Sequence, residues 1–118
     1  MIRAMALLLP FHQPFMAHDD LEMLARRLVD TPVFVEHRWN EQPIGRVAFV
    51  EMAQEGLMVE LSLDRRLPDG MRALAIAQVP ADGLAAGQHP ARGRLEVSIC
   101  QASLHGGRLV ALTDVTRH

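Results

Sequence analysis

Short apolar segments that end near proline or glycine recur along the whole chain. This spacing of turn-forming residues limits the folds that the chain can adopt. The sequence holds seven prolines and eight glycines in 118 residues. Between them lie runs such as Arg3–Leu9, Leu57–Leu63 and Arg94–Cys100, which have the length and composition of strands. The apolar run from Met5 to Phe11 is far too short to span a bilayer and lacks the order of a secretion signal. We therefore expect many short strands, no membrane span and an intracellular location.

One segment has the features of a helix. The stretch from Asp19 to Leu28 begins with acidic residues and ends near Arg26 and Arg27, which suits the helix dipole. Its apolar residues recur at helical spacing, and Thr31-Pro32 is expected to stop it. The order of elements predicts an α+β fold, namely a small, mostly antiparallel β-barrel or strongly bent sheet with one N-terminal packed helix. Residues 1–118 are expected to form a single domain.

The remaining strands follow from the pattern of apolar and turn residues. A hairpin is expected to turn at Glu55-Gly56, and the run Arg72 to Val79 could be a strand or a helix. Asp64 to Met71 is predicted as a turn or a short helical segment, and Pro80 to Gly93 as the main surface loop. Strands are expected at 3–9, 33–35, 46–51, 57–63, 94–100 and 108–112.

Composition excludes several kinds of chemistry. All 12 cationic side chains are arginine, so Schiff-base, P-loop and Ser-Lys chemistry are absent. The single cysteine, Cys100, excludes an internal disulfide and a multi-cysteine zinc site, and the six histidines show no metal-binding spacing. The net charge of −2 argues against a nucleic-acid-binding surface. We expect no cofactor, no metal and no nucleic-acid partner.

Two segments can carry chemistry. His37 follows the apolar strand Val33–Val35, a placement that makes an imidazole both fixed and reachable, as a general base requires. In an alternating strand Glu96, Ser98 and Cys100 share one face, and a serine there can act as a nucleophile if an imidazole reaches its hydroxyl. Of the three serines, Ser62 lies in a strand without a motif and Ser103 in a turn. The structural alternative is an exposed histidine and a serine bonded to backbone.

These segments resemble two related families of viral maturation proteases. The run Val35-Glu36-His37, followed by Pro43, Gly45 and Gly56-Leu57, is similar to the histidine region of herpesvirus assemblins and tailed-phage prohead proteases. Glu96-Val97-Ser98-Ile99-Cys100 resembles their strand with the pattern H-V-S-[LI]-C or E-V-S-[IL]-V. The resemblance covers about residues 32–63 and 92–112. It implies a small barrel with peripheral helices and cleavage of scaffold or capsid proteins during head assembly.

The resemblance also implies roles for individual residues. His37 would be the general base and Ser98 the nucleophile of a serine endopeptidase. The assemblin type implies a second histidine that orients the first, and His118 completes this predicted triad, with His105 as the other histidine candidate. The phage type implies an acid instead, for which Glu96 or Asp114 could serve. In either case the third group fixes the tautomer of the base and stabilises the imidazolium.

Departures from both families lead to a second function. The turn Ser103 to Arg108 lacks the Arg-rich assemblin sequence, and Arg72 to Gln78 contains no serine where phage members carry one. The alternative is therefore a non-catalytic module that binds a capsid, portal or tail component, in the host cytoplasm or the virion. A host-interaction module unrelated to heads is a third class. Arg65 and Arg66 are either solvated charges or a contact for an acidic partner such as a scaffold or capsid surface. A homo-oligomer would have to use a surface such as a strand edge.

Overall fold

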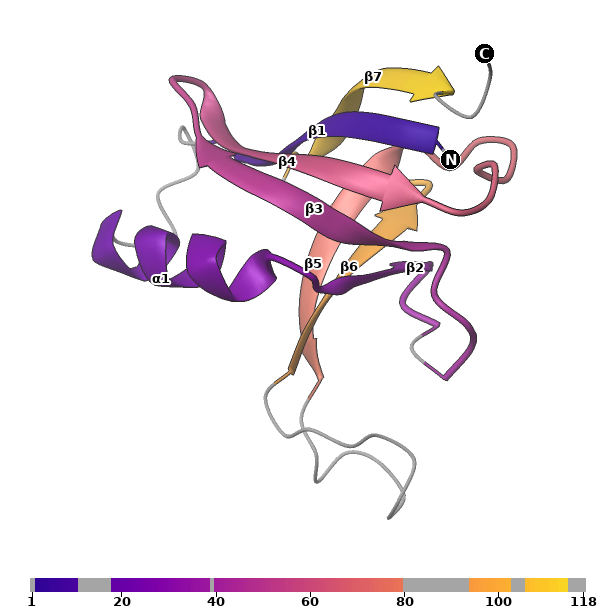
Figure 1. Cartoon of the computed structure of the whole chain (residues 1–118), viewed down its shortest axis with the longest axis horizontal. Coiled ribbons are helices and arrows are strands. Elements are labelled where there is room, and N and C mark those ends of the chain that lie inside the picture. Colours follow the sequence, from indigo (N-terminus) through magenta and orange to yellow (C-terminus); the bar gives the residue numbers. More distant parts are fainter. Residues whose placement is uncertain (1, 11–17, 39, 80–93, 103–105, 115–118) are drawn as a thin grey trace.

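Within the described residues, seven strands close into a barrel in the computed structural model, and one helix packs beside it (Figure 1). The structure describes residues 2–10, 18–38, 40–79, 94–102 and 106–114. This confirms the predicted α+β barrel and shows that the ambiguous segment before residue 80 is a strand. The elements are β1 (Ile2–Pro10), α1 (His18–Leu28), β2 (Pro32–Val35), β3 (Gly45–Met52), β4 (Gly56–Leu63), β5 (Ala73–Val79), β6 (Arg94–Cys100) and β7 (Arg108–Asp114).

Strand order brings early and late parts of the chain together. Around the barrel the order is β1-β4-β3-β2-β6-β5-β7, with β7 returning to β1. All neighbours are antiparallel except β2 and β6, which run parallel with Phe34 opposite Ser98. The predicted hairpin of β3 and β4 is present. The parallel pair places the segment after β2 beside the end of β6.

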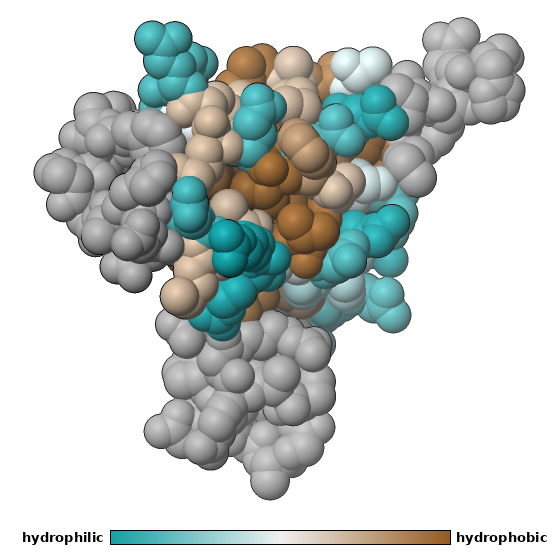
Figure 2. All heavy atoms as spheres, turned by 60° about the vertical axis from the view of Figure 1, so that its left-hand side comes forward, coloured by the Kyte–Doolittle hydropathy of each residue, from teal (hydrophilic) through white to brown (hydrophobic). Residues whose placement is uncertain are grey.

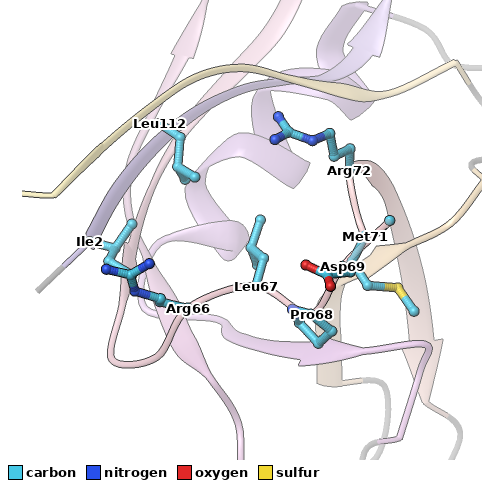
Figure 3. Close-up of a pocket in the computed structure, with 9 residues that line it drawn as sticks. Ile2, Arg66, Leu67, Pro68, Asp69, Met71, Arg72 and Leu112 are labelled. Atoms are coloured by element: carbon cyan, nitrogen blue, oxygen red, sulfur yellow. The ribbon is translucent and has the colours of Figure 1, made fainter.

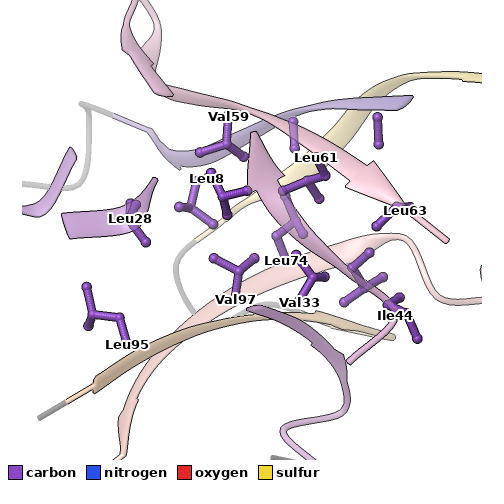
Figure 4. Packing of buried hydrophobic residues seen from close by; sticks show 14 of the residues in the cluster. Leu8, Leu28, Val33, Ile44, Val59, Leu61, Leu63, Leu74, Leu95 and Val97 are labelled. Carbon is purple, nitrogen blue, oxygen red and sulfur yellow. The ribbon is translucent and has the colours of Figure 1, made fainter. Parts of the chain in front are cut away.

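Alternation along β4 shows how the barrel builds its core. Leu57, Val59, Leu61 and Leu63 are fully buried, whereas the residues between them are partly exposed. These side chains meet those of neighbouring strands inside the barrel (Figure 4). Burying one such leucine side chain stabilises the folded state by about 1.5–3 kcal/mol relative to leaving it exposed to water. The period of two in the sequence therefore becomes one apolar interior.

The helix covers the barrel through its apolar stripe. Leu28 is fully buried, and Leu24 and Ala25 pack against the core. Asp30, two residues after the end of α1, has a φ of 67°, and the Thr31 backbone N–H donates to the Leu28 carbonyl at 2.9 Å. A left-handed residue of this kind is a common helix terminator. The helix thus stops just before the predicted Thr31-Pro32 boundary.

Gly45, part of the sequence motif at the start of β3, is required by close packing. A Cβ at this position would collide with the backbone carbonyl of Ser62 on β4. The motif glycine therefore has a structural reason that is independent of chemistry.

Two loop predictions have different outcomes. Asp64 to Met71 forms bends and a turn without a helical segment. The whole of the expected loop Pro80 to Gly93 lies outside the described residues. The strands on either side of it, β5 and β6, pair up to Val79 opposite Arg94.

Candidate functional site

The face of β6 that points away from the barrel interior is polar and yet almost completely buried. Glu96 is 2% exposed, Ser98 0% and Cys100 5%. Val97 and Ile99, which alternate with them, belong to the core cluster. Because neighbouring side chains of a strand point to opposite faces, the three residues lie together on the outer face, as predicted.

Alanines stand opposite this polar row. In the antiparallel register of β5 and β6, Ala75 pairs with Ser98, Ala77 with Glu96 and Ala73 with Cys100. The next strand, β2, brings Phe34 beside Ser98. The facing positions of β5 thus provide no hydroxyl and no charge. Reading the run after Arg72 as a strand would have revealed this alternation of alanines in the sequence.

The turn after β2 directs His37 onto this face. Glu36 and His37 have φ values of 52° and 59°, in the left-handed region that residues other than glycine seldom adopt. The Glu36 carboxylate accepts a hydrogen bond from the Gln101 backbone N–H at 2.9 Å. The Glu36 backbone N–H donates to the Ile99 carbonyl at 3.1 Å. Two adjacent strained residues held by β6 mark a turn whose shape matters. The sequence analysis did not predict the hydrogen bond between the Glu36 carboxylate and Gln101, and no sequence pattern indicates it.

One carboxylate joins the histidine and the serine. Ser98 Oγ donates to Glu96 Oε2 at 2.6 Å, and His37 Nδ1 lies 3.1 Å from Glu96 Oε1. The His37 backbone N–H donates to Ser98 Oγ at 3.1 Å. The imidazole is the solvent-facing member, with 42% of its side chain exposed, whereas the Glu96 side chain is 2% exposed. We call Glu96, Ser98 and His37 the polar cluster.

The structure brings His37 and Ser98 together, but through the histidine backbone. Within the described residues there is no hydrogen bond between the His37 ring and the Ser98 hydroxyl. The ring contacts Glu96, one of the acids left open as the third group. His118 and His105 lie outside the described residues, and Asp114 ends β7 without a described side chain. The catalytic assignment of His37, Ser98 and His118 remains a prediction.

Cys100 is a poor candidate for a nucleophile. Burial raises the pKa of its thiol above the ordinary value, and the negative charge of Glu36 raises it further. The thiolate is the reactive form of cysteine, and the raised pKa leaves little thiolate at neutral pH. Within the described part of the chain, no three His, Cys, Asp or Glu side chains gather as a metal site.

A separate cavity opens between the 64–72 segment and the ends of β1 and β7. Its volume is about 370 Å³. Leu67 and Leu112 point toward each other across it, with Arg66 and Arg72 on opposite sides (Figure 3). None of its lining residues belongs to the polar cluster. They are Ile2, Arg66, Leu67, Pro68, Asp69, Gly70, Met71, Arg72 and Leu112.

Comparison with solved structures relates this barrel to a viral serine protease. The chain superimposes on the KSHV protease, solved with a hexapeptide phosphonate inhibitor, with a TM-score of 0.63 and 12% sequence identity. The match covers 96% of this chain and 65% of that one, so the chain spans about two thirds of its length. The protein therefore has a protease-like fold of the herpesvirus assemblin kind. No protein-family model and no curated protein matches the sequence.

In the described part of the chain, no helix has both the length and the apolar character needed to cross a membrane.

Proposed function

We propose that this protein is a non-catalytic protease-fold module of viral or prophage head assembly, which binds a capsid, portal or tail component. Its place of action would be the host cytoplasm or the virion. The proposal is carried by Ser98, whose side chain is fully buried and whose hydroxyl proton is donated to Glu96. The fold and the sequence resemblance supply the link to head assembly.

A serine nucleophile needs a different environment from that of Ser98. Its hydroxyl proton must go to the imidazole, and its oxygen must face the carbonyl carbon of a substrate. Here the proton is held by a carboxylate at 2.6 Å, and the oxygen already accepts the His37 backbone N–H. The matching face of β5 carries Ala75 opposite Ser98, so it offers no replacement hydroxyl.

The polar cluster instead explains how the barrel holds its β2 turn. A buried carboxylate is costly unless its oxygens are hydrogen-bonded, and both Glu96 oxygens have partners. The same contacts fix His37 in its left-handed conformation beside β6. We infer that the motif that resembles the proteases here has a structural role, which is to hold the turn after β2 against β6.

Exposed apolar side chains support a binding role. The large hydrophobic residues left in water include Met23 and Val29 around α1 and Phe49 on β3. Figure 2 shows apolar surface bordered by hydrophilic residues on one face of the molecule. Apolar surface that is rimmed by polar residues marks sites of interaction with proteins or other ligands.

One observation favours the competing function, a serine endopeptidase. The contact of His37 Nδ1 with Glu96 is the contact that an orienting acid makes with a general base. In that function His37 would be the base and Ser98 the nucleophile, and the scaffold or capsid protein would be cleaved. Ser98 would have to leave Glu96 and turn its hydroxyl toward the imidazole.

A fluorophosphonate probe separates the two functions. Wild-type protein and the Ser98→Ala variant are incubated with the probe beside an active protease of the same fold, and adducts are read by intact mass. We expect the active protease alone to be labelled. A wild-type adduct that disappears in Ser98→Ala would establish Ser98 as a nucleophile and overturn the proposal.

The binding half of the proposal is tested with head proteins of a tailed phage and of a herpesvirus. Purified scaffold, capsid, portal and tail proteins are incubated with the wild type, and both cleavage and co-sedimentation are followed. We expect stable binding to one of them and no cleavage. Absence of binding to all of them, or cleavage that Ser98→Ala abolishes, would contradict the assembly role.

A further inference from the structure

We propose that β7 and the neighbouring cavity form a groove for an extended peptide that presents an apolar side chain between two acidic ones on one face of the added strand. The peptide would add as a strand to the open edge of β7 and place side chains against Leu112, Arg66 and Arg72. The inference rests on the proposed binding function only for its biological setting. Its structural basis is the seam where β5 and β7 separate.

The seam begins one residue into β7. Within the described residues, β7 pairs with β5 only where Ala73 meets Arg108, and the Leu109 N–H donates to the Arg72 carbonyl at 3.1 Å. Beyond that bond β7 continues along β1 to Asp114. Its far edge from residue 110 onward therefore has no strand partner in the described part of the chain. In Figure 1 this stretch lies along the rim of the molecule, beside β1.

The side chains of this open stretch are exposed on both faces. Val110 and Leu112 are 56% and 45% exposed, and Ala111 and Thr113 are exposed as well. The register against β1 shifts near Val110, which twists the strand but leaves its outer edge accessible. An edge with apolar side chains and free backbone groups is a template for an added strand.

The cavity supplies the other wall of the groove. Leu112 belongs to β7 and points into the cavity toward Leu67, and the carbonyl of Arg72 marks the end of the β5–β7 pairing (Figure 3). Its volume of about 370 Å³ lies within the usual range of ligand sites. A strand on the β7 edge would run along this opening with alternate side chains directed to it.

Charge identifies the kind of peptide. Arg66 and Arg72 are exposed and form no ion pair with another described residue, whereas the cavity wall holds one acid, Asp69. Arginine guanidinium groups on opposite sides of a cavity that also holds Leu67 and Leu112 fit carboxylates that flank an apolar side chain. A basic peptide would meet the same charges with repulsion. Because only every second side chain of an added strand faces the cavity, the occupant carries acid, apolar and acid at every second position.

The test is selection from a random library of extended peptides, with the whole protein as bait. We expect selected peptides to carry Asp or Glu, an apolar residue and Asp or Glu at every second position, and to perturb the β7 amide signals in NMR spectra. The double variant R66E/R72E tests the charges, because both side chains are exposed and neither forms an ion pair with another described residue. It should reverse the selection toward Lys and Arg and weaken binding of the wild-type peptides at least about tenfold.

Leu112→Lys tests the apolar half of the groove. It places a charge at an exposed position of the edge, so it should abolish peptide binding and leave the fold intact. The proposal is overturned if no peptides are selected, if the selected peptides lack acids, or if R66E/R72E selects the same ones. Concentration-dependent self-association through β7 that excludes peptides would also overturn it, in favour of a second copy as the occupant. If Leu112→Lys still binds a head protein, the proposed function stands even where the groove proposal has failed.

Discussion

Glu96 links two distant parts of the chain with a single carboxylate. It contacts His37 through one oxygen and Ser98 through the other, across 59 residues of sequence in the first case. Removing one member of such a buried group leaves the remaining polar atoms without partners. The residue that sequence analysis held as one of several open alternatives is thus the centre of the polar cluster.

We expect Glu96→Ala to lower the free energy of unfolding by about 2–4 kcal/mol, because Ser98 loses its acceptor inside the protein. Urea denaturation followed by circular dichroism measures the change. Glu60→Ala is the control, since Glu60 pairs with Arg3 at 3.6 Å on the surface and should cost less than about 1 kcal/mol. Equal losses for the two variants would show that the cluster does not stabilise the fold.

The elements follow from local sequence, whereas their partners do not. Alternation along β4 and the acidic start of α1 are local signals, and the predicted hairpin and helix are present. The parallel pairing of β2 with β6 joins residues more than sixty positions apart, so no window of sequence contains it. For the same reason, the alternation of β6 placed Glu96 and Ser98 on one face but could not tell which of them receives the histidine ring.

The helix supplies a prediction at the scale of the element. Leu28→Ala should cost about 2–5 kcal/mol of unfolding free energy, because Leu28 is fully buried where α1 meets the barrel. Its neighbour Val29 is 45% exposed, and Val29→Ala should change stability by no more than about 0.5 kcal/mol. Thermal unfolding of the pair gives the comparison. A similar loss in both variants would mean that the helix is not anchored through this stripe.

Across the whole molecule, stability is expected to be uneven. β1 pairs with β4 on one side and with β7 on the other, and Ala4 and Ala6 are fully buried. The outer edge of β7 has no such protection in the described residues. Backbone amides that are bonded on both sides exchange with solvent only through larger unfolding events.

Hydrogen exchange measured by NMR should therefore rank the strands. We expect amides of β1 and β4 to exchange slowest, and those on the open edge of β7 to exchange by local opening, at least about a hundredfold faster. Addition of a peptide selected for the groove should slow amide exchange in β7 and leave amide exchange in β4 unchanged. Uniform protection along the barrel would contradict this ranking.

The position of β7 also determines the order in which the fold can be completed during synthesis. Strands β1, β3 and β4 are neighbours in the barrel and leave the ribosome early, so their hairpin and the β1–β4 pairing can form on the nascent chain. The β2 turn must wait for β6, and β1 keeps one edge bare until the last strand arrives. Translation thus leaves the free edge of β1 open in the cell until β7 emerges, and an open strand edge is a template for aggregation during that interval.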